Sequence, residues 1–504
     1  MKKIALVLFI MIMIFGASLG MVLPVKSESI DRMPGFTFDH YPSYEEMNHT
    51  IHQMAQRYSS IMKVFSIGKT WGWNPVTKSY DSPRDIWTVK ISDNVVKDEN
   101  STEPGILITW HHAREWIGPA FNLYLLQHLV EEYESNDTIH WLVDHFEIYI
   151  IPMANADGYV FDGNGDMSNL TGEGTGGWRK NCRDNNGNGK LEVIDKWNAE
   201  GEGVDPERNW DWHWSEGDPH PFSPTYHGPA PFSEPMTQAE RDLILSKDID
   251  SFVVIHSFSA AILLPWFYTS APPPHQSFYE NLGKNMARLT KLDGDSSNHF
   301  LYGQPYEVLG YNAPGGSSDW VYGKLNKMAI AVEMEPLYGN FYTQDGFHPP
   351  PSKIRTYCDD FYEAMLYFLE TSDSILKPKN QSYDQPDPYI VWGHVSDEMG
   401  NPILGAKVEL YNNDTGEKIY TYTDENGFYM LNLATMSHRY NSSTNFTLLV
   451  GDVSINFHVD DNGRKHVELM VYNYIPELSL AYVFPVGIII LAATAKIYKR
   501  RNEG

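Results

Sequence analysis

Two histidines and two glutamates each follow a short apolar, β-rich run of the sequence. They are His112, Glu115, His256 and Glu333. Runs of this kind are typical of strands that are buried on both faces of a parallel sheet. Because ligands bind at the carboxyl ends of the strands in α/β sheets, we expect these four side chains to meet at one edge.

The spacing of His112 and Glu115 places a nitrogen and an oxygen ligand three residues apart. Together with His256 they form a His₂Glu set, which suits catalytic zinc with a fourth position open for water. Taken alone, the spacing fits equally well a surface histidine and a glutamate at the positive end of a helix dipole. The zinc prediction therefore depends on the coincidence of all three residues.

The elements that must position these residues alternate along residues 39–372. Strand-like apolar runs are separated by segments with helical spacing. The strand-like runs are 63–67, 105–110, 146–151, 251–255 and 328–332, and the helical segments include 44–62, 120–133, 237–246, 276–292 and 351–370. This alternation predicts an α/β domain with a mixed, largely parallel central sheet flanked by helices.

The composition changes after residue 372. Residues 373–388 are rich in Lys, Pro, Asn, Gln and Ser, which predicts a linker. Residues 389–472 show short alternating strands between turn sequences and no helical spacing. They are predicted to form a small all-β sandwich.

Both ends of the chain carry signals for export and membrane insertion. Residues 1–20 have a basic start, an apolar run and small residues near their end, which predicts a secretory signal peptide, with an uncleaved anchor as the alternative. Residues 478–495 are uncharged and precede a basic tail, 496–504, which predicts one transmembrane helix with a cytoplasmic tail. The domains between would then be extracellular. A sorting signal that is later removed is the other interpretation.

The chain of 504 residues has 38 Lys and Arg against 65 Asp and Glu, a net charge of −27. Such an acidic chain repels phosphates, so we exclude general nucleic-acid binding. Two cysteines, Cys182 and Cys358, are too few for a disulfide scaffold. One bridge between them and two separate thiols both fit the sequence.

Seven blocks of sequence, in order, resemble the zinc metallocarboxypeptidases, the family of carboxypeptidases A and B and the regulatory carboxypeptidases. The resemblance covers about residues 39–370 and includes His112-Ala113-Arg114-Glu115-Trp116-Ile117. The other blocks are residues 155–159, 178–180, 204–210, 256–259, 311–320 and 332–334. A regulatory-type member would carry a transthyretin-like domain after the catalytic domain, and residues 389–472 resemble such a domain.

The resemblance implies a zinc enzyme that hydrolyses the C-terminal peptide bond of peptides and proteins. It implies that His112, Glu115 and His256 bind Zn²⁺ and that Glu333 is the general base and acid. It also implies that Arg179 stabilises the oxyanion. Since little sequence precedes residue 39, we expect no activation segment of the digestive type.

The residues implied to bind substrate include one departure from the family. The resemblance assigns the terminal carboxylate to Arg208, the mobile closing tyrosine to Tyr311, and a place in the substrate site to Ser257. An asparagine usually precedes the carboxylate-binding arginine, but here the residue is Glu207. A carboxylate there repels a free C-terminus, unless it is protonated or paired with Arg208.

The preference for the C-terminal residue depends on the specificity pocket. Ser318 matches the residue at its base, where basic-specific digestive members carry an acid and aromatic-specific ones a hydrophobe. Phe267 stands where glycine is frequent and shortens the pocket. We expect neutral or small apolar C-terminal residues, while Glu207 and Glu335 keep a basic preference open.

A loop after residue 183 resembles the calcium loop of an EF-hand. The candidate Ca²⁺ ligands are Asp184, Asn186, Asn188, Lys190 (through its backbone carbonyl) and Asp195. Gly189 occupies the position that requires glycine, but an aspartate replaces the usual glutamate at the last position. A plain Gly/Asn-rich turn is the alternative.

The sequence therefore predicts an extracellular, membrane-anchored zinc carboxypeptidase. Two other hypotheses are a zinc amidase or endopeptidase on another peptide-like substrate, such as cell-wall peptide, and a non-catalytic surface binding protein. Glu207 is the main support for the former, whereas the latter would require a lost ligand or a lost Glu333.

Overall fold

The computed structural model describes most of the predicted catalytic and β-sandwich regions. The described residues are 36–99, 103–168, 177–191, 201–339, 346–372, 390–423, 426–433, 444–458 and 464–472. The predicted signal peptide, linker, transmembrane helix and tail lie outside them. Among the helices that the structure describes, none has the length and apolar character needed to span a membrane.

The first region is built on an eight-stranded mixed sheet with the order β1-β4-β6-β5-β7-β10-β8-β9. Neighbours among its four central strands, β6, β5, β7 and β10, pair in parallel. The strands are β1 (Met62–Lys69), β4 (Asp85–Ile91), β5 (Gly105–Trp110), β6 (Glu147–Ile150), β7 (Ile249–Ser257), β8 (Ala261–Leu263), β9 (Leu301–Gly303) and β10 (Met328–Met334). A separate hairpin joins β2 (Trp73–Asn74) and β3 (Ser79–Tyr80). The predicted mixed sheet with a parallel centre is confirmed.

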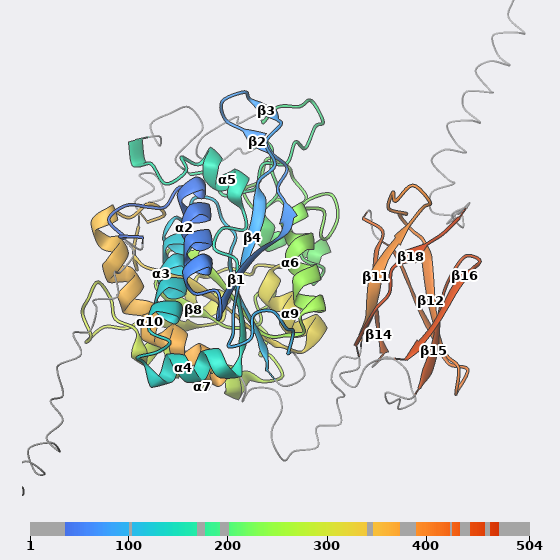
Figure 1. Ribbon diagram of the computed structural model, residues 1–504. Coiled ribbons are helices and arrows are strands. Elements are labelled where there is room, and N and C mark those ends of the chain that lie inside the picture. The colour runs from blue at the N-terminus through green and yellow to red at the C-terminus, as the bar shows by residue number, and fades with distance from the viewer. Residues whose placement is uncertain are drawn as a thin grey trace, which may run out of the picture. The chain divides into compact units, whose positions relative to one another are not determined.

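Helices cover both faces of this sheet. In Figure 1, α2, α3 and α10 lie on one side, and α6 and α9 lie on the other. The helices are α2 (Tyr44–Arg57), α3 (Ile117–Glu131), α4 (Asp137–His145), α5 (Ala156–Phe161), α6 (Pro235–Ser246), α7 (Gln276–Leu289), α8 (Pro305–Val308), α9 (Ser317–Leu325) and α10 (Ile354–Thr371). Short 3₁₀ turns are η2 (Pro206–Arg208), η3 (Trp214–Glu216) and η4 (Pro351–Lys353).

The central strands are apolar because helices bury them on both faces. Every residue of β5 is buried, and so is every residue of β7 except Asp250. β1, at the edge of the sheet, keeps exposed and half-buried positions. Burial on both faces explains why the central strands carry continuous apolar runs rather than alternating ones.

The C-terminal region is a β-sandwich of two four-stranded sheets. One sheet contains β11 (Ile390–Ser396), β14 (Phe428–Asn432), β17 (Arg464–His466) and β18 (Leu469–Met470). The other contains β12 (Lys407–Asn412), β13 (Lys418–Tyr422), β15 (Asn445–Val450) and β16 (Val453–His458). Alternate residues such as Val408, Leu410, Phe446 and Leu448 fill the core between them, as expected for sheets with one face in water.

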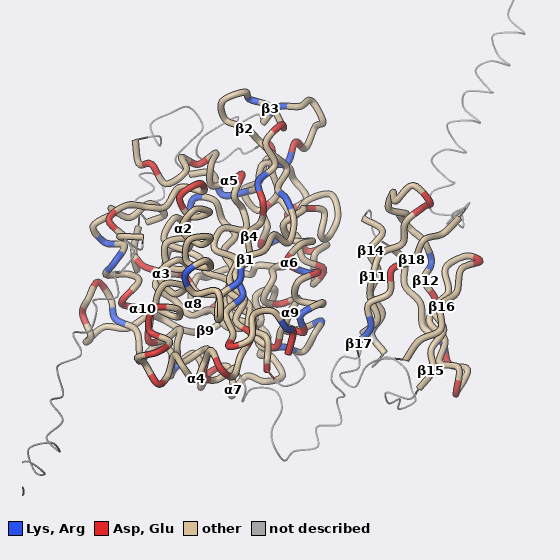
Figure 2. The backbone as a smooth tube through the Cα atoms, in the orientation of Figure 1, with Lys and Arg blue, Asp and Glu red and all other residues tan. Residues whose placement is uncertain are grey.

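Charged residues are distributed along both regions. Figure 2 shows acidic and basic positions interspersed over the described strands, helices and loops. Both cysteines, Cys182 and Cys358, are free and buried. Of the two arrangements left open by the sequence, the structure has two separate thiols.

Helix α3 approaches strand β5 closely at Gly118. A methyl group added there would lie 2.2 Å from Cδ1 of Trp110, whose indole is fully buried. We predict that Gly118→Ala lowers the free energy of unfolding by about 1–3 kcal/mol, because the rigid ring has no room to move. Urea denaturation measures this loss.

Gly283→Ala is the matched helix control, since the nearest atom to its new methyl is the end of the Leu264 side chain, at 2.9 Å. This control should lose less stability, because the flexible leucine adjusts and alanine favours the helix. Equal losses in the two variants would contradict the role of the indole.

Candidate active site

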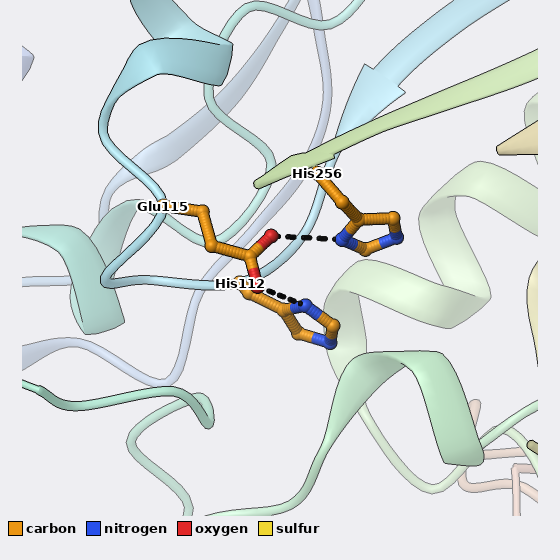
Figure 3. Close-up of side chains that lie close together, drawn as sticks. All are labelled: His112, Glu115 and His256. Carbon is orange, nitrogen blue, oxygen red and sulfur yellow. Dashed lines mark hydrogen bonds and ion pairs between the residues drawn. The ribbon is translucent and has the colours of Figure 1, made fainter. Parts of the chain in front are cut away.

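Three of the predicted ligands converge at the carboxyl ends of β5 and β7. His112 and Glu115 lie in the turn between β5 and α3, and His256 lies near the end of β7. The two carboxylate oxygens of Glu115 lie 2.8 Å from Nδ1 of His112 and 2.9 Å from Nδ1 of His256 (Figure 3). All three side chains are buried, and their candidate ligand atoms lie within 4.8 Å of one another.

The donor set fits zinc. Two imidazoles and one carboxylate are the ligands of a catalytic zinc site with an open fourth position. The two histidine rings lie 4.4 Å apart, centroid to centroid, around the Glu115 carboxylate. Among the described residues, this group is the only fully buried one of its kind. His112, Glu115 and His256 would therefore hold the metal.

A carboxylate that the sequence reasoning did not single out orients one ligand. Nε2 of His112 donates to Asp205 at 3.0 Å, which leaves Nδ1 facing Glu115. Asp205 also forms an ion pair with Arg179 at 2.9 Å. Burial alone would raise the pKa of the Asp205 carboxyl, but Arg179 and His112 hold it well below its usual range. Asp205 therefore fixes both a candidate ligand and the candidate oxyanion-binding arginine.

Glu333 reaches the site through strand register. β10 pairs with β7 in parallel, and Glu333 lies directly opposite His256. Its Oε2 atom is buried and has no hydrogen-bond partner among the described residues. Burial first, and then the negative charge of Glu115, raise the pKa of Glu333 well above its ordinary value. A carboxylate in this environment accepts a proton readily.

A pocket with about 420 Å³ of empty space, part of it open solvent, adjoins the ligands. It brings together most of the predicted substrate-binding residues with apolar side chains from β8, β10 and the loops around α8. The lining residues are His112, Arg179, Glu207, Arg208, His256, Leu263, Phe267, Pro305, Leu309, Tyr311, Ala313, Gly316, Ala331 and Glu333. Tyr311 is 49% exposed at its mouth.

Three residues considered in the sequence analysis do not line this pocket. Ser318 is 1% exposed near the start of α9, and its buried Oγ makes no hydrogen bond within the described structure. Ser257 is buried, and its backbone N–H donates a hydrogen bond to Oε2 of Glu115 at 3.2 Å. Glu335 is also buried and accepts from the backbone of Asp293. The expected substrate contacts of Ser318 and Ser257, and a basic preference through Glu335, have no geometric support here.

The sequence left two states open for Glu207, protonation or pairing with Arg208, and the structure shows neither. Its carboxylate accepts hydrogen bonds from Nδ1 of His111 and from Oγ of Ser317, the latter at 2.6 Å. Arg208 instead donates to the backbone carbonyl of Glu207 at 2.8 Å. Burial would raise the pKa of Glu207, but the neighbouring His111 lowers it to about 2. Glu207 is therefore ionised and paired with a histidine that the sequence analysis missed.

The candidate calcium loop is described only in part, because Asp195 lies outside the described residues. The carboxylate of Asp184 accepts backbone N–H bonds from Gly187 at 2.7 Å and Gly189 at 2.6 Å. Asn186 and Asn188 accept backbone N–H bonds in the same way. These bonds describe a tight turn around Asp184, and Ca²⁺ binding stays a prediction.

A family comparison identifies the class to which this fold and site belong. Residues 47–364 match the model of the peptidase M14 family, described as zinc carboxypeptidase. The chain therefore belongs to the zinc carboxypeptidase family and is a zinc-dependent metallocarboxypeptidase. This confirms the family predicted from the seven sequence blocks.

Individual relatives agree with this assignment. Carboxypeptidase B of Rattus norvegicus is 30% identical over 351 residues, which are 68% of this chain and 74% of that protein. Zinc carboxypeptidase A 1 of Anopheles gambiae is 28% identical over 348 residues, or 67% of this chain and 69% of that one.

Solved structures share the fold. Bovine thrombin-activatable fibrinolysis inhibitor, solved in complex with tick carboxypeptidase inhibitor, is 25% identical with a TM-score of 0.53, covering 67% of this chain and 98% of its own. The carboxypeptidase A of Helicoverpa armigera is 24% identical with a TM-score of 0.55, covering 68% of this chain and 76% of its own.

We predict that Asp205→Asn weakens zinc binding by about 10–100-fold, because His112 loses the carboxylate that fixes its ring. Competition with a chromogenic chelator measures the affinity. Asp211→Asn is the control, since Asp211 pairs with Lys324 on the surface, at 3.3 Å. An unchanged zinc affinity in Asp205→Asn would show that Asp205 does not position the ligand.

Proposed function

We propose that the enzyme removes C-terminal residues from peptides and proteins, with Glu333 as its general base and acid. The observation that carries this proposal is one pocket lined by both histidines of the His₂Glu set, by Glu333 and by two arginines. When bound, zinc supplies a positive charge that polarises the scissile carbonyl and lowers the pKa of the attacking water.

The remaining steps belong to the chain's own side chains. Glu333 takes a proton from the attacking water and later delivers it to the leaving amine, as its raised pKa favours. Arg179, held by Asp205, offers its guanidinium to the developing oxyanion. Arg208 pairs with the terminal carboxylate, because a guanidinium fork binds a carboxylate bidentately. Tyr311, exposed at the pocket mouth, closes over the substrate.

The side-chain pocket supports a preference for neutral, small to medium apolar C-terminal residues. Leu263, Phe267, Leu309, Ala313 and Ala331 supply apolar lining. Phe267 is 6% exposed, and its backbone N–H donates to Asp319 at 3.0 Å, so the backbone that carries the ring is held in place. Among the described residues that line the pocket, the acids are Glu207 and Glu333. Glu207 is thus the one acidic lining residue besides the proposed general base.

The location of the enzyme is a further part of the proposal. The apolar segments 1–20 and 478–495 support an exported catalytic domain that a C-terminal helix holds at the cell membrane. The sandwich of residues 390–472 is proposed to be the transthyretin-like module of a regulatory-type member. Eight Asn-x-Ser/Thr sequons agree with an extracellular, glycosylated protein.

We predict that Glu333→Gln lowers kcat by about 10²–10⁴-fold, because the amide cannot accept the water's proton. Release of the C-terminal amino acid from a peptide panel measures the loss, and the zinc content should stay that of the unmodified enzyme. A zinc chelator should abolish the same activity.

Glu335→Gln is the matched control on the same side of the sheet, just beyond the end of β10. Burial raises the pKa of Glu335 to about 8, so the neutral amide resembles its native state, and its carboxylate lies outside the pocket. Retained activity in Glu333→Gln would overturn the assignment of the base. Cleavage of amidated peptides as fast as of free ones would instead favour the amidase hypothesis.

We predict that Phe267→Gly moves the preference toward larger C-terminal residues. Removing the ring enlarges the apolar pocket, so the ratio of kcat/KM for C-terminal Phe over C-terminal Val should rise about tenfold. Phe222→Gly is the control, since Phe222 is 53% exposed outside the pocket. An unchanged ratio would mean that Phe267 does not shape the side-chain site.

A further inference from the structure

A chain of buried polar side chains runs from the sheet to the wall of the substrate pocket. Oγ1 of Thr109 in β5 donates to Glu240 of α6, and Oε2 of Glu240 lies 2.7 Å from Nε2 of His111. His111 in turn bonds Glu207, which Ser317 holds from the other side. The side chains of His111 and Glu240 are fully buried.

The geometry fixes the hydrogen bonds within this chain. Each ring nitrogen of His111 faces a carboxylate oxygen, one of Glu240 and one of Glu207. Because a carboxylate oxygen is the acceptor on each side, the ring nitrogens are used as donors. Two buried carboxylates that would otherwise be costly in the interior thereby each have a hydrogen-bond partner.

The position of Glu207 makes this pairing relevant to the substrate. Glu207 and Arg208 are adjacent in η2 and both line the pocket. An ionised carboxylate beside Arg208 would repel the carboxylate of a C-terminal residue or take the guanidinium as its own partner. Instead, the Oε1 atom of Glu207 is taken up by His111 and Ser317, and its Oε2 atom accepts from the backbone of Ser317 at 3.2 Å.

We propose that His111, backed by Glu240, is a positioning residue that allows this pocket to read a terminal carboxylate. His111 holds the Glu207 carboxylate against Ser317, so that the guanidinium of Arg208 remains available to the substrate. The proposal rests on the proposed carboxypeptidase function and adds the residues that make Glu207 compatible with it. Neither His111 nor Glu240 touches the substrate.

The test separates control of the Glu207 carboxylate from a merely structural role. His111→Gln should raise KM for peptides with a free C-terminus at least about tenfold while kcat changes less, because the Glu207 carboxylate loses the ring that holds it and competes for Arg208. In the double variant His111→Gln/Glu207→Gln, KM should return toward that of the unmodified enzyme. His220→Gln is the control, since the side chain of His220 is 79% exposed.

A binding measurement needs no turnover. Calorimetry compares N-acetylleucine with N-acetylleucinamide, which differ in the charge of the terminal group. His111→Gln should weaken only the carboxylate ligand. Glu207→Gln leaves His111 in place and should strengthen the preference for carboxylate over carboxamide at least about tenfold. This variant tests the proposal if His111→Gln does not fold.

The outcomes are distinct. Three results would overturn the role of His111. In His111→Gln, binding of N-acetylleucine and of N-acetylleucinamide could weaken equally, or KM could rise by the same factor whether or not Glu207→Gln is also present. In Glu207→Gln, the preference for carboxylate over carboxamide could be unchanged or lower. Failure of the unmodified enzyme to release any C-terminal residue would instead overturn the proposed function. Calorimetric binding of the carboxylate ligand would still decide the role of His111 in that case.

Discussion

The parallel, in-register pairing of β5, β7 and β10 is the constraint on which the site depends. This pairing brings the end of each strand to the same edge, where His112, His256 and Glu333 emerge. Glu115 then ties the two histidines together through both of its carboxylate oxygens. A slip of one residue in either pairing would turn a ligand toward the opposite face of the sheet and separate the group.

The buried charge of the site is balanced in pairs that extend outward from the ligands. Asp205 contacts both His112 and Arg179, so the candidate metal site and the candidate oxyanion site share one counter-ion. His111 joins Glu207 to Glu240 and thereby connects the pocket wall to helix α6. Removing one partner of such a group leaves an uncompensated charge in the interior, which is far more costly than the pair. These residues are therefore interdependent.

Much of this arrangement could be predicted from the sequence, and the exceptions have physical causes. The central strands were predictable because burial on both faces leaves continuous apolar runs, and the ligands because they follow those runs directly. The three-residue strands β8 and β9 leave too short a pattern to detect. His111 and Glu240 were missed because they lie 129 positions apart in the sequence, and only tertiary packing makes them partners. Ser318 illustrates the reverse case, since a match in sequence position could not reveal that this residue is buried and absent from the lining of the pocket.

The two buried thiols bear on the covalent chemistry of the protein. Burial raises the pKa of both Cys182 and Cys358, so neither thiol forms the reactive thiolate readily, and no disulfide contributes to the fold. The covalent structure of the chain is consequently the same in reducing and in oxidising surroundings. Its stability rests on packing and on buried ion pairs, and a change of redox environment would neither complete nor undo the fold.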